Sequence, residues 1–152
     1  MVQTSSVLIV DDELGPRESL RMILKPLYDV RTATNGQEAL DYIQKEKIDL
    51  ITLDIKMPGL SGIDVLRELR KLGSDAAVVI VTGYGTLTNV HDAIRYGAVD
   101  FVSKPFNVPE IIAIVNKSVA QRNYNQKLKN ISQKIRNIRA WEDKEVNEFL
   151  SH

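Results

Sequence analysis

Five short apolar segments, rich in β-branched residues, recur at fairly even intervals over most of the chain. They cover residues 7–10, 28–32, 50–53, 78–81 and 99–102, and this length and composition predict strands. Between and after them, apolar residues recur every three or four positions, which predicts helices. The residues that mark the helices are Leu20, Ile23, Leu24 and Leu27; Ala39, Leu40 and Ile43; Ile63, Leu66 and Leu69; Leu87, Val90 and Ile94; and Ile111, Ile112, Val115 and Val119.

This alternation constrains the fold to the α/β class. Strands that are apolar throughout and alternate with helices predict a parallel sheet that is covered on both faces. We expect a doubly wound, five-stranded, flavodoxin-like sheet of order 2-1-3-4-5, in which strands 1 and 3 are neighbours at the switch point. The chain length suits such a domain over residues 1–120, with residues 121–152 left as a helical extension.

Composition excludes several classes of protein. The chain has no cysteine, so neither disulfides nor thiol chemistry are available. The first apolar segment is followed at once by Asp11-Asp12-Glu13, which argues against a signal peptide, and the longest apolar run, residues 76–81, is far too short to cross a bilayer. We therefore expect a cytoplasmic protein with no membrane partner.

Acidic residues end two of the predicted strands. Asp11 and Asp12 follow the first strand and Asp54 follows the third, so their carboxylates should meet in one crevice. Carboxylates that are this close repel one another unless a cation compensates them. Mg²⁺ prefers such hard oxygen ligands, and we predict Asp12 and Asp54 as direct ligands and Asp11 as a ligand through water.

A carboxylate can also attack phosphorus and form an aspartyl phosphate. Because both partners are negatively charged, the site then needs cationic and hydrogen-bonding groups aimed at the phosphoryl oxygens. Lys104 follows the fifth strand and Thr82 the fourth, and Gly83 leaves room beside Thr82. We therefore predict that Asp54 accepts a phosphoryl group.

In their order and strand context, Asp11, Asp12, Asp54, Thr82 and Lys104-Pro105 resemble the response-regulator receiver family, the CheY-like domains of bacterial two-component signalling. The resemblance covers about residues 6–120. It implies that a sensor histidine kinase or a phosphotransfer protein phosphorylates Asp54, and that the protein is a signalling domain rather than an enzyme. Phosphoryl acceptance and slow phosphoryl loss would be its only self-catalysed steps.

The resemblance also implies roles for single residues. Asp11, Asp12, Asp54 and the backbone carbonyl of Lys56 would bind Mg²⁺. Lys104 would pair with the phosphate and Thr82 would move toward it. The Lys104–Pro105 peptide bond would be cis.

Three positions bear on switching and on the lifetime of the phosphorylated form. Phe101 matches the family's aromatic switch position, which is often Tyr. Its ring can swing between rotamers but has no hydroxyl. The alternative is that Phe101 has no role in switching and is simply a core residue. Lys56 and Tyr84 lie two residues after Asp54 and Thr82, at positions that resemble those tuning phosphoryl loss. A bulky tyrosine and a long cationic side chain predict a long-lived phosphorylated form.

The extension differs from the domain in charge. Residues 1–115 hold 16 acidic and 12 basic residues, whereas residues 116–139 hold seven basic residues and no acidic one. The basic residues are Lys117, Arg122, Lys127, Lys129, Lys134, Arg136 and Arg139. A basic helix can meet nucleic acid, but no recognition motif is evident, and a charge run on a helix is usually a solvated face.

The extension also has a heptad pattern, because Tyr124, Leu128, Ile131, Ile135 and Ile138 are spaced four, three, four and three residues apart. Such a helix either pairs two chains, as linkers between receiver and effector domains do, or folds back on its own domain. We favour a homodimer, formed through the extension and the fourth and fifth elements, over direct contact with nucleic acid.

The output stays open at this level. There are three alternatives. The chain is a stand-alone receiver or phosphorelay intermediate, or it is the front part of a longer regulator such as an enhancer-binding transcription activator. The third alternative is a DNA-binding regulator that acts through the basic extension. A phosphatase that passes through an aspartyl phosphate would need a second acid near Asp54, and Ile55-Lys56 provides none. A flavodoxin-like cofactor carrier would need a phosphate-cradling loop where the chain has Asp11-Asp12-Glu13.

Overall fold

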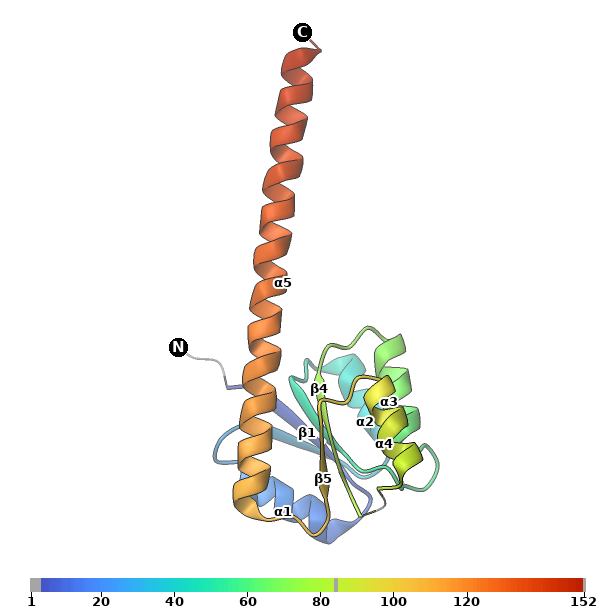
Figure 1. Ribbon diagram of the computed structural model, residues 1–152. Coiled ribbons are helices and arrows are strands. Elements are labelled where there is room, and N and C mark those ends of the chain that lie inside the picture. The colour runs from blue at the N-terminus through green and yellow to red at the C-terminus, as the bar shows by residue number, and fades with distance from the viewer. Residues whose placement is uncertain (1–3, 84, 152) are drawn as a thin grey trace. The chain divides into compact units, whose positions relative to one another are not determined.

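The computed structural model describes residues 4–83 and 85–151. The chain divides into two compact units, Met1–Arg122 and Asn123–His152. Strands and helices alternate along the chain (Figure 1): β1 (Ser6–Val10), α1 (Leu14–Leu24), β2 (Asp29–Ala33), α2 (Gly36–Lys45), β3 (Leu50–Leu53), α3 (Gly62–Lys71), β4 (Ala77–Thr82), α4 (Leu87–Arg95), β5 (Asp100–Ser103) and α5 (Val108–Leu150). The predicted alternation of strand and helix is confirmed.

The five strands form one parallel sheet of order β2-β1-β3-β4-β5, so the predicted fold class is also confirmed. Val10 of β1 lies opposite Leu53 of β3, which in turn lies opposite Ile80 of β4. The strands therefore end at nearly the same level. Their following loops gather along one edge of the sheet, at the switch point between β1 and β3.

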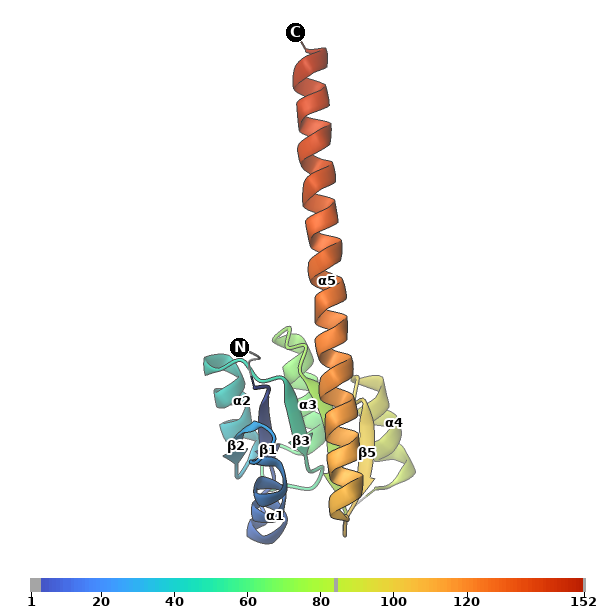
Figure 2. The same cartoon turned by 90° about the vertical axis from the view of Figure 1, so that its left-hand side faces the viewer.

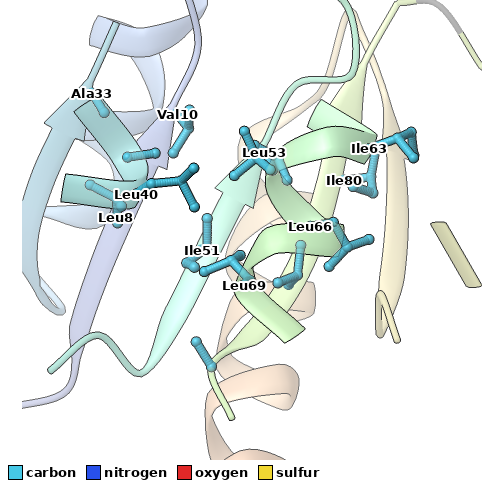
Figure 3. Close-up of a cluster of buried hydrophobic side chains, with 14 of the residues drawn as sticks. Leu8, Val10, Ala33, Leu40, Ile51, Leu53, Ile63, Leu66, Leu69 and Ile80 are labelled. Atoms are coloured by element: carbon cyan, nitrogen blue, oxygen red, sulfur yellow. The ribbon is translucent and has the colours of Figure 1, made fainter. Parts of the chain in front are cut away.

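Alternate side chains of each strand pack on opposite faces of the sheet. Leu8, Val10, Ile51 and Leu53 belong to a cluster beneath α2, α3 and α4 (Figure 3), in which Leu66 and Leu69 are fully buried. Residues on the other face of the strands pack against α1 and the first turns of α5 (Figure 2). Burial on both faces explains why the inner strands β1, β3 and β4 are almost entirely apolar rather than alternating, whereas the edge strands β2 and β5 carry more polar residues.

Two of the residues that mark the predicted helices are exposed, among those whose side chains the structure describes. Leu27 is 46% exposed because α1 ends at Leu24; Pro26 has no N–H with which to continue the helix. Ile94 is 67% exposed, because α4 buries its neighbour Ala93 against the sheet instead. The apolar face of α4 is thus turned by one residue from the predicted one.

The second unit is helical from Asn123 to Leu150, within α5. The five residues of its heptad pattern are all exposed. Among the residues that the structure describes, no helix combines the length and the apolarity that a bilayer span requires.

Candidate functional site

Asp54 stands directly after β3, whose four residues are all buried. Its backbone N–H donates to the carbonyl of Val10, 3.1 Å away, so the ladder between β1 and β3 continues up to the carboxylate. The side chain is only 2% exposed, and no described residue hydrogen-bonds to its Oδ1 atom. A buried carboxylate oxygen without a partner is costly, and it calls for an explanation such as a bound ion or a catalytic role.

Gly62, at the start of α3, holds the backbone of Asp54 in place, and the sequence reading missed it. Its N–H donates to the carbonyl of Ile55 at 2.7 Å. A Cβ atom at this position would lie 2.0 Å from the backbone oxygen of Asp54, so only glycine allows this approach. The available signal was its place directly after Ser61, which forms a capping box with Asp64.

Lys104 joins two strand ends at the site. Its Nζ atom lies 2.7 Å from Asp11 Oδ2 and 2.9 Å from Asp54 Oδ2. The other carboxylate oxygen of Asp11 accepts the backbone N–H of Glu13 at 2.9 Å. The structure therefore brings together the three residues that the sequence predicted from the ends of β1, β3 and β5.

Burial and these hydrogen bonds act in opposite directions on the pKa values. Burial raises the pKa of the Asp11 carboxyl above its ordinary value, and the hydrogen bonds from Lys104 and from the Glu13 backbone only partly offset it. Burial alone would lower the pKa of Lys104, but its hydrogen bonds to Asp11 and Asp54 outweigh that effect and raise it. Lys104 is thus held as a cation between two carboxylates.

Four carboxylates gather at this edge. Asp11, Asp12, Glu13 and Asp54 each offer an oxygen atom, and these atoms all lie within 4.8 Å of one another. Glu13 was not predicted; its position at the end of the acidic run after β1 was the available signal. The ammonium group of Lys104 pairs with two of these four carboxylates and supplies one positive charge against their four negative ones.

The donor set fits a divalent cation such as Mg²⁺. All four groups are hard oxygen ligands, and Asp54 Oδ1 is buried with a lone pair still to satisfy. Asp12 and Glu13 also line a surface hollow of about 360 Å³ together with Lys56, Met57 and Pro58. Lys56, whose backbone carbonyl was predicted as a ligand, therefore lies at the same hollow.

Thr82 and the Lys104–Pro105 bond lie at the same edge of the sheet. Thr82 is 1% exposed at the end of β4, and its carbonyl accepts the N–H of Lys104 at 3.0 Å. The Lys104–Pro105 peptide bond is cis, as the resemblance implies. Tyr84 lies outside the described residues.

Phe101 of β5 is half-buried and packs against the cluster beneath α2, α3 and α4. A Cβ atom at Gly85 would lie 2.8 Å from its Cζ atom, so the ring abuts the loop between β4 and α4. The ring is therefore placed where movement of that loop would reach it, although it contributes to the core as well.

A search of protein families matches residues 7–116 to the response regulator receiver domain. Sporulation initiation phosphotransferase F of Bacillus subtilis is 37% identical over 117 residues, which cover 76% of this chain and 94% of that protein. The chemotaxis protein CheY of Thermotoga maritima is 39% identical over 113 residues, covering 73% and 94%. A crystal structure of NtrX from Brucella abortus is similar with a TM-score of 0.78 and 30% identity, covering 85% of this chain and 30% of that one.

Proposed function

The chain belongs to the response regulator receiver domain family, and we propose that it works as a phosphoryl-accepting receiver of a two-component system in the cytoplasm. Asp54 is the acceptor, and a sensor histidine kinase or a phosphotransfer protein is the donor. The observation that carries this proposal is the buried Oδ1 atom of Asp54, which has no hydrogen-bond partner in the described chain and stands beside Asp11 and Lys104.

Phosphoryl transfer would use Asp54 Oδ1 as the nucleophile. A bond forms between this oxygen and phosphorus while the bond between phosphorus and the donor's imidazole nitrogen breaks. The bonding electron pair goes to that nitrogen, which can take up a proton. Oδ1 is suited to the attack because its partner oxygen, Oδ2, is the one that Lys104 holds.

Lys104 would then stabilise the product. Its ammonium group is held between Asp11 and Asp54 and needs only a small movement to donate to a phosphoryl oxygen. The Thr82 hydroxyl, at the end of the neighbouring strand, would donate to another phosphoryl oxygen. If Lys104 turns to the phosphoryl group, it gives up its contact with Asp11, so phosphorylation would also change the surroundings of the loop after β1.

Asp11, Asp12, Asp54 and the backbone carbonyl of Lys56 would hold Mg²⁺, with Glu13 beside them. When bound, the ion would supply positive charge that offsets the charge of the phosphoryl oxygens. Asp12 and Asp54 are the proposed direct ligands, and Asp11 acts through water because its carboxylate is already occupied by Lys104 and the Glu13 N–H.

Phosphorylation would shift a two-state equilibrium. The phosphoryl group binds Thr82 and Lys104 better in one state, and movement of Thr82 gives Phe101 room to change rotamer. The resulting change reaches α4, β5 and α5, a surface for dimerisation or for control of a partner. Lys56 and Tyr84 would slow hydrolysis of the acyl phosphate by shielding it.

The relatives represent two domain organisations, and each implies a different way in which the receiver passes on its signal. CheY and sporulation phosphotransferase F are matched over 94% of their lengths, whereas NtrX is matched over 30%. A stand-alone receiver or phosphorelay intermediate fits the first plan. A receiver that governs a further domain, including one for transcription control, fits the second.

The direct test is incubation with phosphoramidate, whose P–N bond resembles that of phosphohistidine, with and without Mg²⁺. Intact mass spectrometry should detect one added phosphoryl group, and borohydride reduction followed by peptide mapping should place it on Asp54. Asp54→Ala should abolish uptake, while Asp41→Ala, which removes an exposed acid on α2, should leave it unchanged. Uptake that persists in Asp54→Ala would refute the assignment.

A further inference from the structure

The second unit carries an exposed apolar stripe along one side of its helix. The stripe consists of Tyr124 (58% exposed), Leu128 (46%), Ile131 (54%), Ile135 (48%) and Ile138 (57%). The heptad spacing aligns these residues over four turns, and a contiguous apolar surface of this kind marks an interaction site. The distribution of charged residues beside the stripe indicates which partner would pack on it.

The stripe continues past Ile138 with charged residues. The same spacing places Glu142 and Glu145 at the next two positions and Phe149 at the third. The charges of the unit are separated along its length: Lys127, Lys129, Lys134, Arg136 and Arg139 precede Trp141, whereas Glu142, Asp143, Glu145 and Glu148 follow it, interrupted only by Lys144. The helix is thus basic in its first part and acidic in its last.

A parallel, in-register pair of such helices would oppose like charges. Glu142 and Glu145 would each face their own copy across the seam, and Lys134 would flank Arg139 of the second copy. The parallel pair would keep the apolar residues of the stripe opposite their own copies, and Trp141 would contact Val146 of the second copy. It would still leave two facing pairs of carboxylates partly removed from water, with no cation at the flanking positions beside them.

An antiparallel pair places the basic part of one helix beside the acidic part of the other. With Ile135 opposite Ile138 of the second copy, Tyr124 lies opposite Phe149 of that copy. Lys127 then flanks Glu148 of the second copy, and Lys134 flanks its Trp141 ring, with which an ammonium group can make a cation–π contact.

The same register places Leu128 opposite Glu145 of the second copy and Ile131 opposite its Glu142. The glutamate stems can cover these apolar side chains while their carboxylates reach toward the flanking lysines. Each contact occurs twice because a two-fold axis relates the copies.

We propose that two copies of this chain pair through residues 124–149 in antiparallel orientation. The pairing goes beyond phosphoryl acceptance and does not depend on it, because charge and apolar surface within the helix carry it. A failure of the phosphorylation experiment would therefore leave this proposal standing, and the reverse is also true.

Because the chain has no cysteine, single introduced cysteines can report the orientation. Leu128→Cys and Glu145→Cys are prepared as full-length proteins, and disulfide formation is followed for each variant alone and for their equimolar mixture. In the antiparallel pair, the thiol introduced at position 128 faces the thiol introduced at position 145 of the second copy. Two thiols at position 128 would lie about 25 Å apart, too far for a disulfide. Gln133→Cys, on the opposite side of the helix, measures the rate of random collision.

The expected result is a mixture that cross-links at least about tenfold faster than Gln133→Cys, while Leu128→Cys alone and Glu145→Cys alone stay near the Gln133→Cys rate. Light scattering of the unaltered protein should show a dimer that forms with rising concentration. Rapid cross-linking of Leu128→Cys with itself would overturn the proposal in favour of a parallel pair. A monomer at every concentration, with no cross-link in the mixture, would overturn it as well.

Discussion

The first unit holds two clusters in which one basic side chain bridges two aspartates, and they lie at opposite ends of the strands. They are Lys104 with Asp11 and Asp54 at the C-terminal ends, and Arg122 with Asp49 and Asp75 at the ends where β3 and β4 begin. The chemical groups are alike, and the basic side chains are both largely buried, at 14% and 8% exposed. What differs is how completely the two carboxylate oxygens of Asp49 and of Asp54 are paired.

In the Arg122 cluster, both oxygens of Asp49 have partners. Oδ1 lies 2.8 Å from Arg122 Nη1, and Oδ2 accepts the N–H and the hydroxyl of Ser6 at 2.8 and 3.2 Å. In the Lys104 cluster, Asp54 Oδ1 has no partner among the described residues. A carboxylate whose two oxygens are both paired, such as that of Asp49, stabilises the fold and has no oxygen left for a ligand, whereas the carboxylate of Asp54 retains Oδ1 for one.

The largest effect on stability is expected for Arg122→Met, which leaves the Asp49 carboxylate without its ion pair. Breaking a buried pair in this way should lower the free energy of unfolding by about 2–3 kcal/mol, measured by urea titration. Phosphoryl uptake under native conditions should persist. Arg136→Met, which removes an exposed cation, is the control and should change neither quantity. Loss of uptake in Arg122→Met as complete as in Asp54→Ala would show that the two clusters are not independent.

Gly62→Ala should destabilise the protein nearly as much as Arg122→Met, although it acts at the other end of the sheet. The added Cβ collides with the backbone of Asp54, so we expect a loss of about 2 kcal/mol in the free energy of unfolding and slower phosphoryl uptake. Gly15→Ala is the matched control, because nothing lies within 4 Å of a Cβ atom there. Normal uptake in Gly62→Ala would mean that the acceptor does not depend on this contact.

Mg²⁺ should distinguish the clusters by ligand binding. An ion that binds only the folded protein should raise the free energy of unfolding by about 1–3 kcal/mol at saturating concentration. A chelator should reverse this increase. Thermal unfolding should show this gain in the unaltered protein and in Arg122→Met, and its loss in Asp12→Ala. A gain that survives in Asp12→Ala would place the ion elsewhere.

The smallest effect on stability is expected for Asp54→Asn. This change removes one negative charge from a crowded group of carboxylates and should raise the free energy of unfolding by up to about 1 kcal/mol, although it also weakens the ion pair with Lys104. Phosphoryl uptake should vanish. Urea titration that instead shows a loss comparable with that of Arg122→Met would contradict the contrast between the two clusters.

The sequence predicted the sheet and its acidic edge because both follow from local patterns. Apolar strands, their order and the residues just after them are readable one segment at a time, and this placed Asp11, Asp54 and Lys104 correctly relative to the strands. Arg122, in contrast, was grouped with the solvated basic residues of the extension and is buried against Asp49 and Asp75. No local pattern reveals a partner that is 47 residues away in the chain.

The same limit explains the other differences. The requirement for glycine at position 62 depends on how closely α3 approaches the Asp54 backbone, which is a distance between segments. The exposure of Ile94 depends on which side of a short helix meets the sheet. Both are set by tertiary packing, whereas periodicity only narrows the choice to a few neighbouring residues.

The order of the strands also explains which side-chain lengths are needed around the proposed acceptor, Asp54. Asp54 follows the middle strand, β3, so groups from β1 and β4 start only one strand spacing away, and short side chains such as those of Asp11 and Thr82 suffice there. Position 104 follows β5, two strands and about 10 Å from the acceptor strand, and there only a long side chain can span the gap. The groups around the proposed acceptor are therefore graded in reach, and the strand order requires a long side chain at position 104 in addition to the positive charge that the proposed chemistry requires.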